Sequence, residues 1–303
     1  MTTTPHGLFP ILATPFDSGG ALDITSLRRL VEFQMSCGVA GVATFGLASE
    51  GFALTADERD SILDAIVEVT GRSLPLVAGV AATSTVTAVE QGLRTAERGA
   101  DLLMVMPPFM VKPSGAQLVD FYGEVASAVG IPVMVQDAPA STGVNMPADL
   151  IGRLSTVEGV NSVKVEAPPT APKVSAVCAL VGPEFAVFGG QNAQFVLDEY
   201  LRGAVGTMPA CEFSDVLQPI LCDLQAGREE EARTAFTRLL PLLLYGLQTG
   251  LAWAIHKEVL VRRGLIETAV VRAPAQPIDD VTRSGLIAVM RQLRLAPVKV
   301  SHG

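Results

Sequence analysis

The sequence carries little charge and has no surplus of basic residues. Only 17% of its 303 residues are charged, and 31 Asp and Glu outnumber 22 Lys and Arg, for a net charge of −9. Low charge together with 49% hydrophobic residues excludes an intrinsically disordered chain. The missing basic surplus argues against nucleic acid as the main partner, because bound phosphates must be neutralised. An anionic small molecule stays compatible, since a single cation or helix end can bind a carboxylate.

Patterns for metal, disulfide and membrane structures are also missing. The four cysteines form no CxxC pair and the three histidines are scattered, so we expect no zinc or other metal site and no disulfide framework. No uncharged apolar run approaches the roughly 18 residues of a membrane span, and the longest, 102–111, is interrupted by Pro107 and Pro108. The first residues lack a basic segment followed by an apolar one, so we expect no signal peptide and a cytoplasmic protein.

The sequence does contain one pattern that is repeated eight times up to about residue 210. Each repeat is a short apolar run, then polar residues, then a stretch with helical spacing. The runs are Leu8–Phe16, Val42–Phe45, Leu74–Val80, Leu102–Met106, Pro132–Val135, Val160–Val165, Phe185–Phe188 and Ala204–Met208. Because parallel strands need crossover connections, this pattern predicts an α/β fold, a (β/α)8 TIM barrel over residues 1–210. A doubly wound open sheet is the alternative.

The stretches between the runs carry helix signals. Thr55 and Glu58 have the spacing of a capping box, as do Ser114 and Gln117, and Asn192 is placed to cap the helix before the last run. The helix after the third run has its apolar residues at Val89, Leu93 and Ala96.

Strand signals stop after the eighth run. Helical spacing then predicts helices at Glu229–Tyr245, Gly250–Arg263 and Val281–Leu293. We therefore expect residues 211–303 to form a C-terminal helical extension packed on the barrel.

Lys164 is the first candidate for chemistry, because barrel enzymes place reactive groups at the C-terminal ends of their strands. Among five lysines, only Lys164 lies inside an apolar run. Burying a lysine is costly unless it is paired or used. Two interpretations follow: Lys164 is a Schiff-base nucleophile, or it belongs to a structural ion pair.

Glu166 lies two residues after Lys164, and residues at this spacing share one face of a strand. A carboxylate beside an amine can carry protons to and from a substrate. It also favours the charged ammonium, which is not nucleophilic. Glu166 is therefore either the catalytic acid and base or an ion-pair partner.

Several strand ends carry residues suited to substrate binding. The loop Gly46–Gly51 offers backbone N–H groups and the Ser49 hydroxyl for a carboxylate. Gln136 follows the fifth run, and Gly189–Gly190 would let a ligand approach the backbone. The residues that we expect to contact substrate are Ala48, Ser49, Gln136, Gly190 and Met208.

Together these segments resemble the dihydrodipicolinate synthase / N-acetylneuraminate lyase family of Schiff-base 2-keto acid lyases. The resemblance runs through nearly the whole chain and rests on Ala13–Phe16, Gly46–Leu54, Met106–Phe109, Lys112–Ser114, Pro132–Pro139, Lys164, Gly189–Gly190, Gly203–Gly206 and Arg272–Pro277. It implies that Lys164 forms the imine and that the protein assembles as a homo-oligomer, a tetramer or a dimer. No cofactor is expected, because the protonated imine is itself the electron sink.

The sequence departs from the proton relay of the family's synthases and aldolases. That relay uses a threonine and two tyrosines, and the matching positions hold Leu47–Ala48, Phe109–Met110 and Gln136. The arginine that binds a second carboxylate in the synthases falls at Ser141. The three tyrosines, Tyr122, Tyr200 and Tyr245, all lie in helix patterns.

Ser49–Glu50, the Gln136–Pro139 stretch and the Lys164–Glu166 spacing instead resemble the 2-keto-3-deoxy sugar acid dehydratases, such as L-2-keto-3-deoxyarabonate dehydratase. The resemblance implies that Lys164 forms an imine with the C2 ketone and that Glu166 carries the proton as the C4 hydroxyl leaves. The alternatives are an aldolase that releases pyruvate and an aldehyde, a synthase-like condensation, a deaminating lyase, and a non-catalytic ligand-binding barrel.

Overall fold

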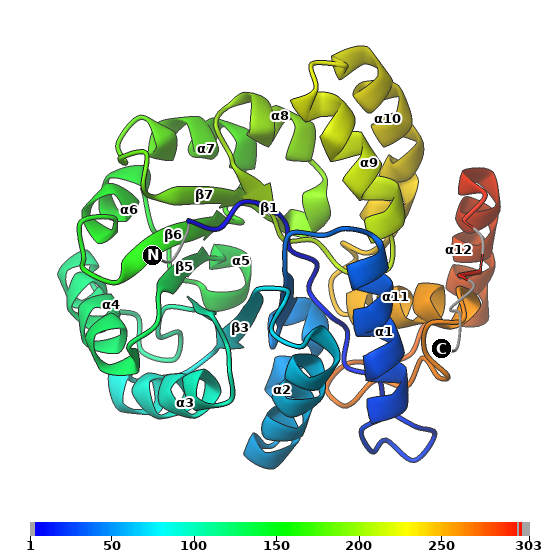
Figure 1. The fold of residues 1–303 in the computed structure, drawn as a ribbon, viewed down its shortest axis with the longest axis horizontal. Helices are drawn as coiled ribbons and strands as arrows, with labels where there is room; N and C mark the ends of the chain where they lie inside the picture. The colour runs from blue at the N-terminus through cyan, green and yellow to red at the C-terminus, as the bar shows by residue number, and fades with distance from the viewer. Residues whose placement is uncertain (1–3, 296, 299–303) are drawn as a thin grey trace. The chain divides into compact units, whose positions relative to one another are not determined.

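The computed structural model describes residues 4–295 and 297–298, and the chain divides into two compact units. Unit 1 consists of Met1–Phe9 and Pro75–Pro209, and unit 2 consists of Pro10–Leu74 and Ala210–Gly303. Strands and helices alternate along the first two thirds of the chain, and helices follow (Figure 1). The expected division between residues 1–210 and residues 211–303 stays a prediction.

Parallel strands form the centre of unit 1. They pair in the order β1-β8-β7-β6-β5-β4-β3. The strands are β1 (Gly7–Leu8), β3 (Leu76–Val80), β4 (Leu102–Val105), β5 (Val133–Asp137), β6 (Val160–Val165), β7 (Ala186–Gly189) and β8 (Gly206–Thr207). Nearly all of their residues are buried, because a parallel sheet is covered on both faces.

Helices connect the strands from β3 to β8 in succession, and all but the short helix that directly follows β5 lie along the outer side of the strands (Figure 1). They are α3 (Thr85–Glu97), α4 (Gly115–Val129), α5 (Pro139–Thr142), α6 (Ala148–Leu154), α7 (Thr170–Cys178) and α8 (Val196–Leu201), with a short 3-10 turn η3 (Gln191–Ala193) before α8. The capping box of Ser114 and Gln117 at the start of α4 is confirmed.

The register of β5, β6 and β7 sorts the strand ends into two rows. Gln136, Lys164 and Phe188 are aligned in one row, and Asp137, Val165 and Gly189 are aligned in the next. Because successive side chains of a strand point to opposite faces, the second row faces away from the first. Gln136 and Lys164 therefore share a face, and Asp137 points to the other.

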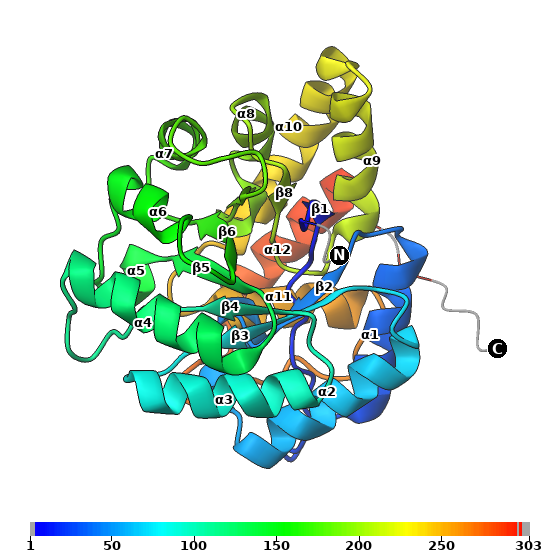
Figure 2. The same cartoon turned by 60° about the vertical axis from the view of Figure 1, so that its left-hand side comes forward.

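The described part of unit 2 contains the short strand β2, and its other elements are helices. Its elements are α1 (Ile24–Ser36), β2 (Val42–Thr44), η1 (Leu47–Ser49), η2 (Gly51–Ala53), α2 (Ala56–Thr70), α9 (Ser214–Gln225), α10 (Glu229–Tyr245), α11 (Ala252–Arg262) and α12 (Asp280–Leu293). Figure 2 shows α9 and α10 side by side. The capping box of Thr55 and Glu58 at the start of α2 is confirmed.

The first strand is much shorter than the predicted Leu8–Phe16, since β1 covers only Gly7–Leu8. Pro10 and Pro15 lack the N–H that a strand ladder needs, and Ile11 makes only isolated bridges. Helix α9 is missing from the predicted set, and it contains Pro219 in its interior.

The prediction that Asn192 caps the following helix is wrong. Asn192 lies within η3 in a left-handed conformation with φ of 53°, and α8 starts only at Val196, with Phe195 at the N-cap position. Gln191, in the same turn, also has a positive φ. The extra turn directs the Gln191 side chain to the end of β6, where it donates to Glu166 O.

Candidate active site

The Lys164 amine lies deep in unit 1. Lys164 is near the end of β6, between Val163 and Val165, and is 2% exposed. An amine in such surroundings needs a polar partner, because its desolvation is otherwise uncompensated. The sequence prediction that a lysine is buried at this strand end is therefore confirmed.

Glu166 supplies the polar partner of Lys164. Its Oε1 lies 3.1 Å from Lys164 Nζ, and its Oε2 accepts a hydrogen bond of 2.8 Å from Gln136 Nε2. The backbone of Glu166 is fixed on both sides, since its N–H donates to Asp137 O and its carbonyl accepts from Gln191 Nε2 at 2.6 Å. The carboxylate is thus held in one orientation toward the amine.

Three of the predicted site residues, Lys164, Glu166 and Gln136, therefore lie together. Gln136 is 1% exposed, and its amide donates a hydrogen bond to the Glu166 carboxylate inside the protein. The group combines an amine able to attack a carbonyl with a carboxylate able to take up and return a proton. The expected contact of Gln136 with substrate hydroxyls stays a prediction.

Gly190 is also part of this group, although its visible role differs from the expected one. A Cβ at Gly190 would overlap Glu166 Cγ and lie 3.1 Å from Glu166 Oε1. Only glycine therefore leaves room for the Glu166 side chain at this place. Met208 follows β8 with its side chain buried, and its backbone N–H donates to Gly189 O. Substrate contacts of Gly190 and Met208 stay predictions.

Two further carboxyl groups lie behind the site and were missed by the sequence analysis. Asp137 is fully buried and its Oδ2 lies 2.6 Å from Lys173 Nζ of α7. Burial raises the pKa of Asp137 to about 6 against the opposing effect of Lys173, and the charge of Glu166 adds to the rise. The signal was available, because Asp137 is a charged residue at the end of an apolar run, as Lys164 is.

Glu199 of α8 is the second of these carboxyl groups and is fully buried. Its Oε1 accepts a hydrogen bond of 2.5 Å from Thr170 Oγ1. Burial raises the pKa of Glu199 to about 7, and the charges of Glu166 and Asp198 add to the rise. Its position in a short helix gave no sequence signal of burial.

Ala48 and Ser49 lie in the other unit, in η1. Ser49 is fully buried, its hydroxyl donates to Leu12 O at 2.6 Å, and its carbonyl accepts from Thr14 Oγ1 at 2.6 Å. The loop is therefore rigidly held within unit 2. The binding of a substrate carboxylate by Ala48 and Ser49 stays a prediction.

Glu50 closes this loop in a left-handed conformation and is fully buried. It forms an ion pair with Lys257 of α11, and its Oε2 accepts from the Arg272 N–H at 2.9 Å. Burial lowers the pKa of Lys257 to about 8, although Glu50 opposes this. Lys257 is thus a second buried lysine, and the apolar residues Ala254 and Leu260 on its helix face were the signal for it.

The tyrosines stand where the sequence placed them, in helices. Tyr122 of α4 is fully buried and donates to Val105 O at 3.0 Å, and burial raises its pKa well above the ordinary range. Tyr200 belongs to α8 and Tyr245 to α10. In the Lys164 group, the hydrogen-bonding side chain from β5 is the Gln136 amide.

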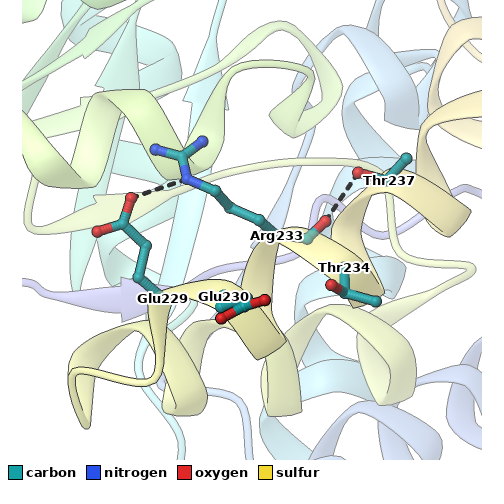
Figure 3. A pocket seen from close by; sticks show the side chains of 5 residues that line it. All are labelled: Glu229, Glu230, Arg233, Thr234 and Thr237. Carbon is teal, nitrogen blue, oxygen red and sulfur yellow. Dashed lines mark hydrogen bonds and ion pairs between the residues drawn. The ribbon is translucent and has the colours of Figure 1, made fainter.

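A hollow of about 430 Å³ on α10 is lined by Glu229, Glu230, Arg233, Thr234 and Thr237 (Figure 3). All of its residues come from one helix, and Arg233 forms an ion pair with Glu229 at 2.7 Å, so we assign it no chemistry. Among the described residues, no group of three or more His, Cys, Asp or Glu is placed to hold a metal ion. None of the described helices is both long enough and apolar enough to cross a membrane.

The chain belongs to the dihydrodipicolinate synthetase family, whose pattern it matches over residues 4–293. It is 32% identical over 309 residues to an L-2-keto-3-deoxyarabonate dehydratase of Azospirillum brasilense, and the alignment covers 99% of each chain. It is 33% identical over 239 residues to a 4-hydroxy-tetrahydrodipicolinate synthase of Stenotrophomonas maltophilia, covering 78% of this chain and 79% of that one. The family resemblance drawn from the sequence is confirmed.

Solved structures support the fold. A dihydrodipicolinate synthase from Rhodopseudomonas palustris matches with a TM-score of 0.90 and 25% identity, covering 97% of this chain and 99% of that one. A putatively assigned dihydrodipicolinate synthetase from Pseudomonas aeruginosa matches with a TM-score of 0.89 and 28% identity, covering 95% and 99%. The predicted (β/α)8 TIM barrel with a C-terminal helical extension is therefore confirmed, and the chain is a member of a lyase and synthase family.

Proposed function

We propose that the protein is a lysine Schiff-base hydro-lyase that dehydrates a 2-keto-3-deoxy sugar acid such as L-2-keto-3-deoxyarabonate. The observation that carries the proposal is the Lys164 amine 3.1 Å from a Glu166 carboxylate that Gln136 orients. The similarity to the Azospirillum brasilense dehydratase over 99% of both chains supports it. No organic cofactor or metal enters the scheme.

The reaction starts with attack of neutral Lys164 Nζ on the C2 ketone. Loss of water from this adduct gives a protonated imine, which makes the C3–H proton acidic because it can accept the electron pair of that bond. Glu166 takes a proton from C3, and an enamine forms. The protonated Glu166 then returns its proton to the C4 hydroxyl, which leaves as water. Hydrolysis of the resulting imine frees Lys164 and the dehydrated 2-keto acid.

Gln136 stands where the synthases and aldolases carry a tyrosine of their proton relay. The absence of that tyrosine favours dehydration over reactions that make or break a carbon–carbon bond. The amide of Gln136 is a donor to Glu166 and does not ionise, so it cannot relay a proton as a phenol does. A pyruvate-condensing synthase is the second candidate, because several such synthases are among the relatives. An aldolase is the third.

The decisive experiment is trapping of the imine. The protein is incubated with pyruvate and, separately, with L-2-keto-3-deoxyarabonate, then treated with borohydride, and the adduct is located by peptide mass spectrometry. We expect a ligand-sized adduct on Lys164 and none on the other lysines. The Lys164→Arg variant, with a matched charge, should give no adduct.

Product analysis separates the candidate reactions. Dehydration leaves the carbon skeleton in one piece, aldol cleavage gives pyruvate and an aldehyde, and a synthase consumes pyruvate only with an aldehyde partner. Folded protein that gives no adduct on Lys164 with either acid would overturn the Schiff-base mechanism and favour a non-catalytic ligand-binding barrel. The homo-oligomeric state and cytoplasmic location stay predictions, which gel filtration and fractionation would test.

A further inference from the structure

The Glu199 carboxyl is buried without a full set of partners. Glu199 is fully buried, and its Oε1 accepts from Thr170 Oγ1 of α7. Among the residues that the structure describes, its Oε2 has no hydrogen-bond partner and Glu199 forms no ion pair. Ionisation of a fully buried carboxyl group without a cation partner is unfavourable because the charge loses its hydration, so the neutral acid is favoured.

Glu199 packs against the end of β7, and the Glu166 side chain, which follows β6, packs against the next residue of the chain. A Cβ at Gly189 would overlap Glu199 Oε2, and a Cβ at Gly190 would overlap Glu166 Cγ. Successive residues of an extended strand point to opposite faces. The two carboxyl groups therefore lie on opposite sides of the Gly189–Gly190 backbone, one against each glycine.

The charged groups around Glu199 are mostly acidic. Glu166 lies across the glycine pair, Asp198 is the neighbouring residue on α8, and Asp137 lies in the row of Gly189 at the end of β5. The cation of α7 that faces this layer is Lys173, and it is paired with Asp137. Burial, with added repulsion from Glu166 and Asp198, raises the pKa of Glu199 to about 7.

We propose that Glu199 is a positioning residue for the Lys164–Glu166 pair: while it is protonated, it keeps a second negative charge away from the side of the Gly189–Gly190 backbone opposite Glu166. When Glu199 ionises, its charge acts across the Gly189–Gly190 backbone and favours the ammonium form of Lys164. The charged amine cannot attack a ketone. Ionised Glu199 thus lowers the fraction of Lys164 that is present as the neutral, nucleophilic amine at alkaline pH, without touching substrate.

The first test reads the proton on Glu199 directly and requires no activity. Protein labelled with carbon-13 at the glutamate side-chain carboxyl is titrated by NMR, so that Asp137 and Asp198 are silent. We expect one glutamate with a midpoint of about 7. That signal should be missing in Glu199→Gln, and in Glu166→Gln its midpoint should be lower. If every glutamate titrates below about pH 5, or the signal survives in Glu199→Gln, the proposal is wrong.

The second test reads the effect on Lys164, and it rests on the proposed function. The rate of adduct formation on Lys164 with pyruvate and cyanoborohydride is measured against pH for the wild type and for Glu199→Gln. We expect the ratio of variant to wild-type rate to be flat below about pH 6 and to rise by about 5-fold as pH passes through the Glu199 midpoint. A merely structural role would change the ratio by the same factor at every pH.

Glu184→Gln is the matched control, because it is the same substitution at an exposed glutamate in the segment before β7. Its ratio to the wild type should show no step near neutral pH. A flat ratio for Glu199→Gln would overturn the proposal. A wild-type protein that forms no adduct at any pH would instead overturn the proposed function, and the NMR titration would still decide the protonation of Glu199 and its coupling to Glu166.

Discussion

At the residue scale, Gln136 is expected to control turnover more than substrate binding. Its Nε2 donates to Glu166 Oε2 at 2.8 Å, so Gln136→Met removes the donor while keeping the side chain's length. A carboxylate that loses its orientation by about 1 Å costs on the order of 10²-fold in rate. We expect kcat with L-2-keto-3-deoxyarabonate to fall by about that factor.

Imine formation separates this role from a general loss of structure. Gln136→Met should still give the borohydride adduct on Lys164 and should leave KM within about 3-fold of the wild type, because the proton-transfer step alone is affected. A variant with unchanged kcat would show that Glu166 needs no orientation by Gln136. A variant without adduct would show that Gln136 serves Lys164 itself.

The pairing of Lys164 with Glu166 could be predicted from sequence because it depends only on the period of one strand. The partner of Gln136 could not, because it depends on the register between two strands. A register shift between Val133 and Met134 sets which residue of β5 lies beside Lys164. The burial of Glu199 depends in the same way on a contact between α8 and β7 that no local pattern encodes.

At the element scale, the strands and long helices follow local patterns, while packing decides which helix face is buried. Sequence and structure agree on Val160–Val165 for β6 and on Glu229–Tyr245 for α10. For α3, the helix predicted around Val89, Leu93 and Ala96 is confirmed, but these are not its most buried residues. The buried residues of α3 are Ala88, Gly92 and Thr95, and Leu93 is 39% exposed. Gly92 has no side chain, and this leaves room for Val129 and Leu103, which lie close to its backbone.

Gly92 gives a test of this packing. A Cβ at Gly92 would lie 2.7 Å from Val129 Cγ1 and 3.0 Å from Leu103 Cδ1. Replacing glycine by alanine in a helix gains about 1 kcal/mol, but overpacking costs about 1–3 kcal/mol. Because two branched side chains must move at once, we expect Gly92→Ala to lower the free energy of unfolding by about 1 kcal/mol, measured by urea denaturation.

Gly123 in α4 is the matched control for Gly92. A Cβ there would meet only Val157 Cγ1 at 3.7 Å, which is an ordinary contact. Gly123→Ala therefore keeps the gain in helix propensity without a clash and should raise the free energy of unfolding by about 0.5–1 kcal/mol. Two variants that shift stability in the same direction would contradict the packing of α3 against α4.

At the scale of the whole molecule, buried carboxyl groups make folding depend on pH in an unusual direction. The pKa of Asp137 is raised to about 6 and that of Glu199 to about 7, mainly by burial. In the unfolded chain both groups ionise near their ordinary values of about 4. Between these values the folded protein holds more protons than the unfolded chain, so stability falls as pH rises, and the fall ends above about pH 7.

The contribution of Glu199 to this fall can be isolated with Glu199→Gln, which cannot ionise. A rise of the pKa from 4.5 to about 7 corresponds to about 3 kcal/mol. We therefore expect the stability of the variant relative to the wild type to increase by most of that amount between pH 5 and pH 8, in urea denaturation at a series of pH values. The same difference for Glu184→Gln should hardly change with pH, because that group is exposed. A pH-independent difference for Glu199→Gln would mean that Glu199 is already ionised in the folded protein at pH 5, as it is in the unfolded chain. The relative stability of the variant rises with pH only if Glu199 is buried in its protonated form.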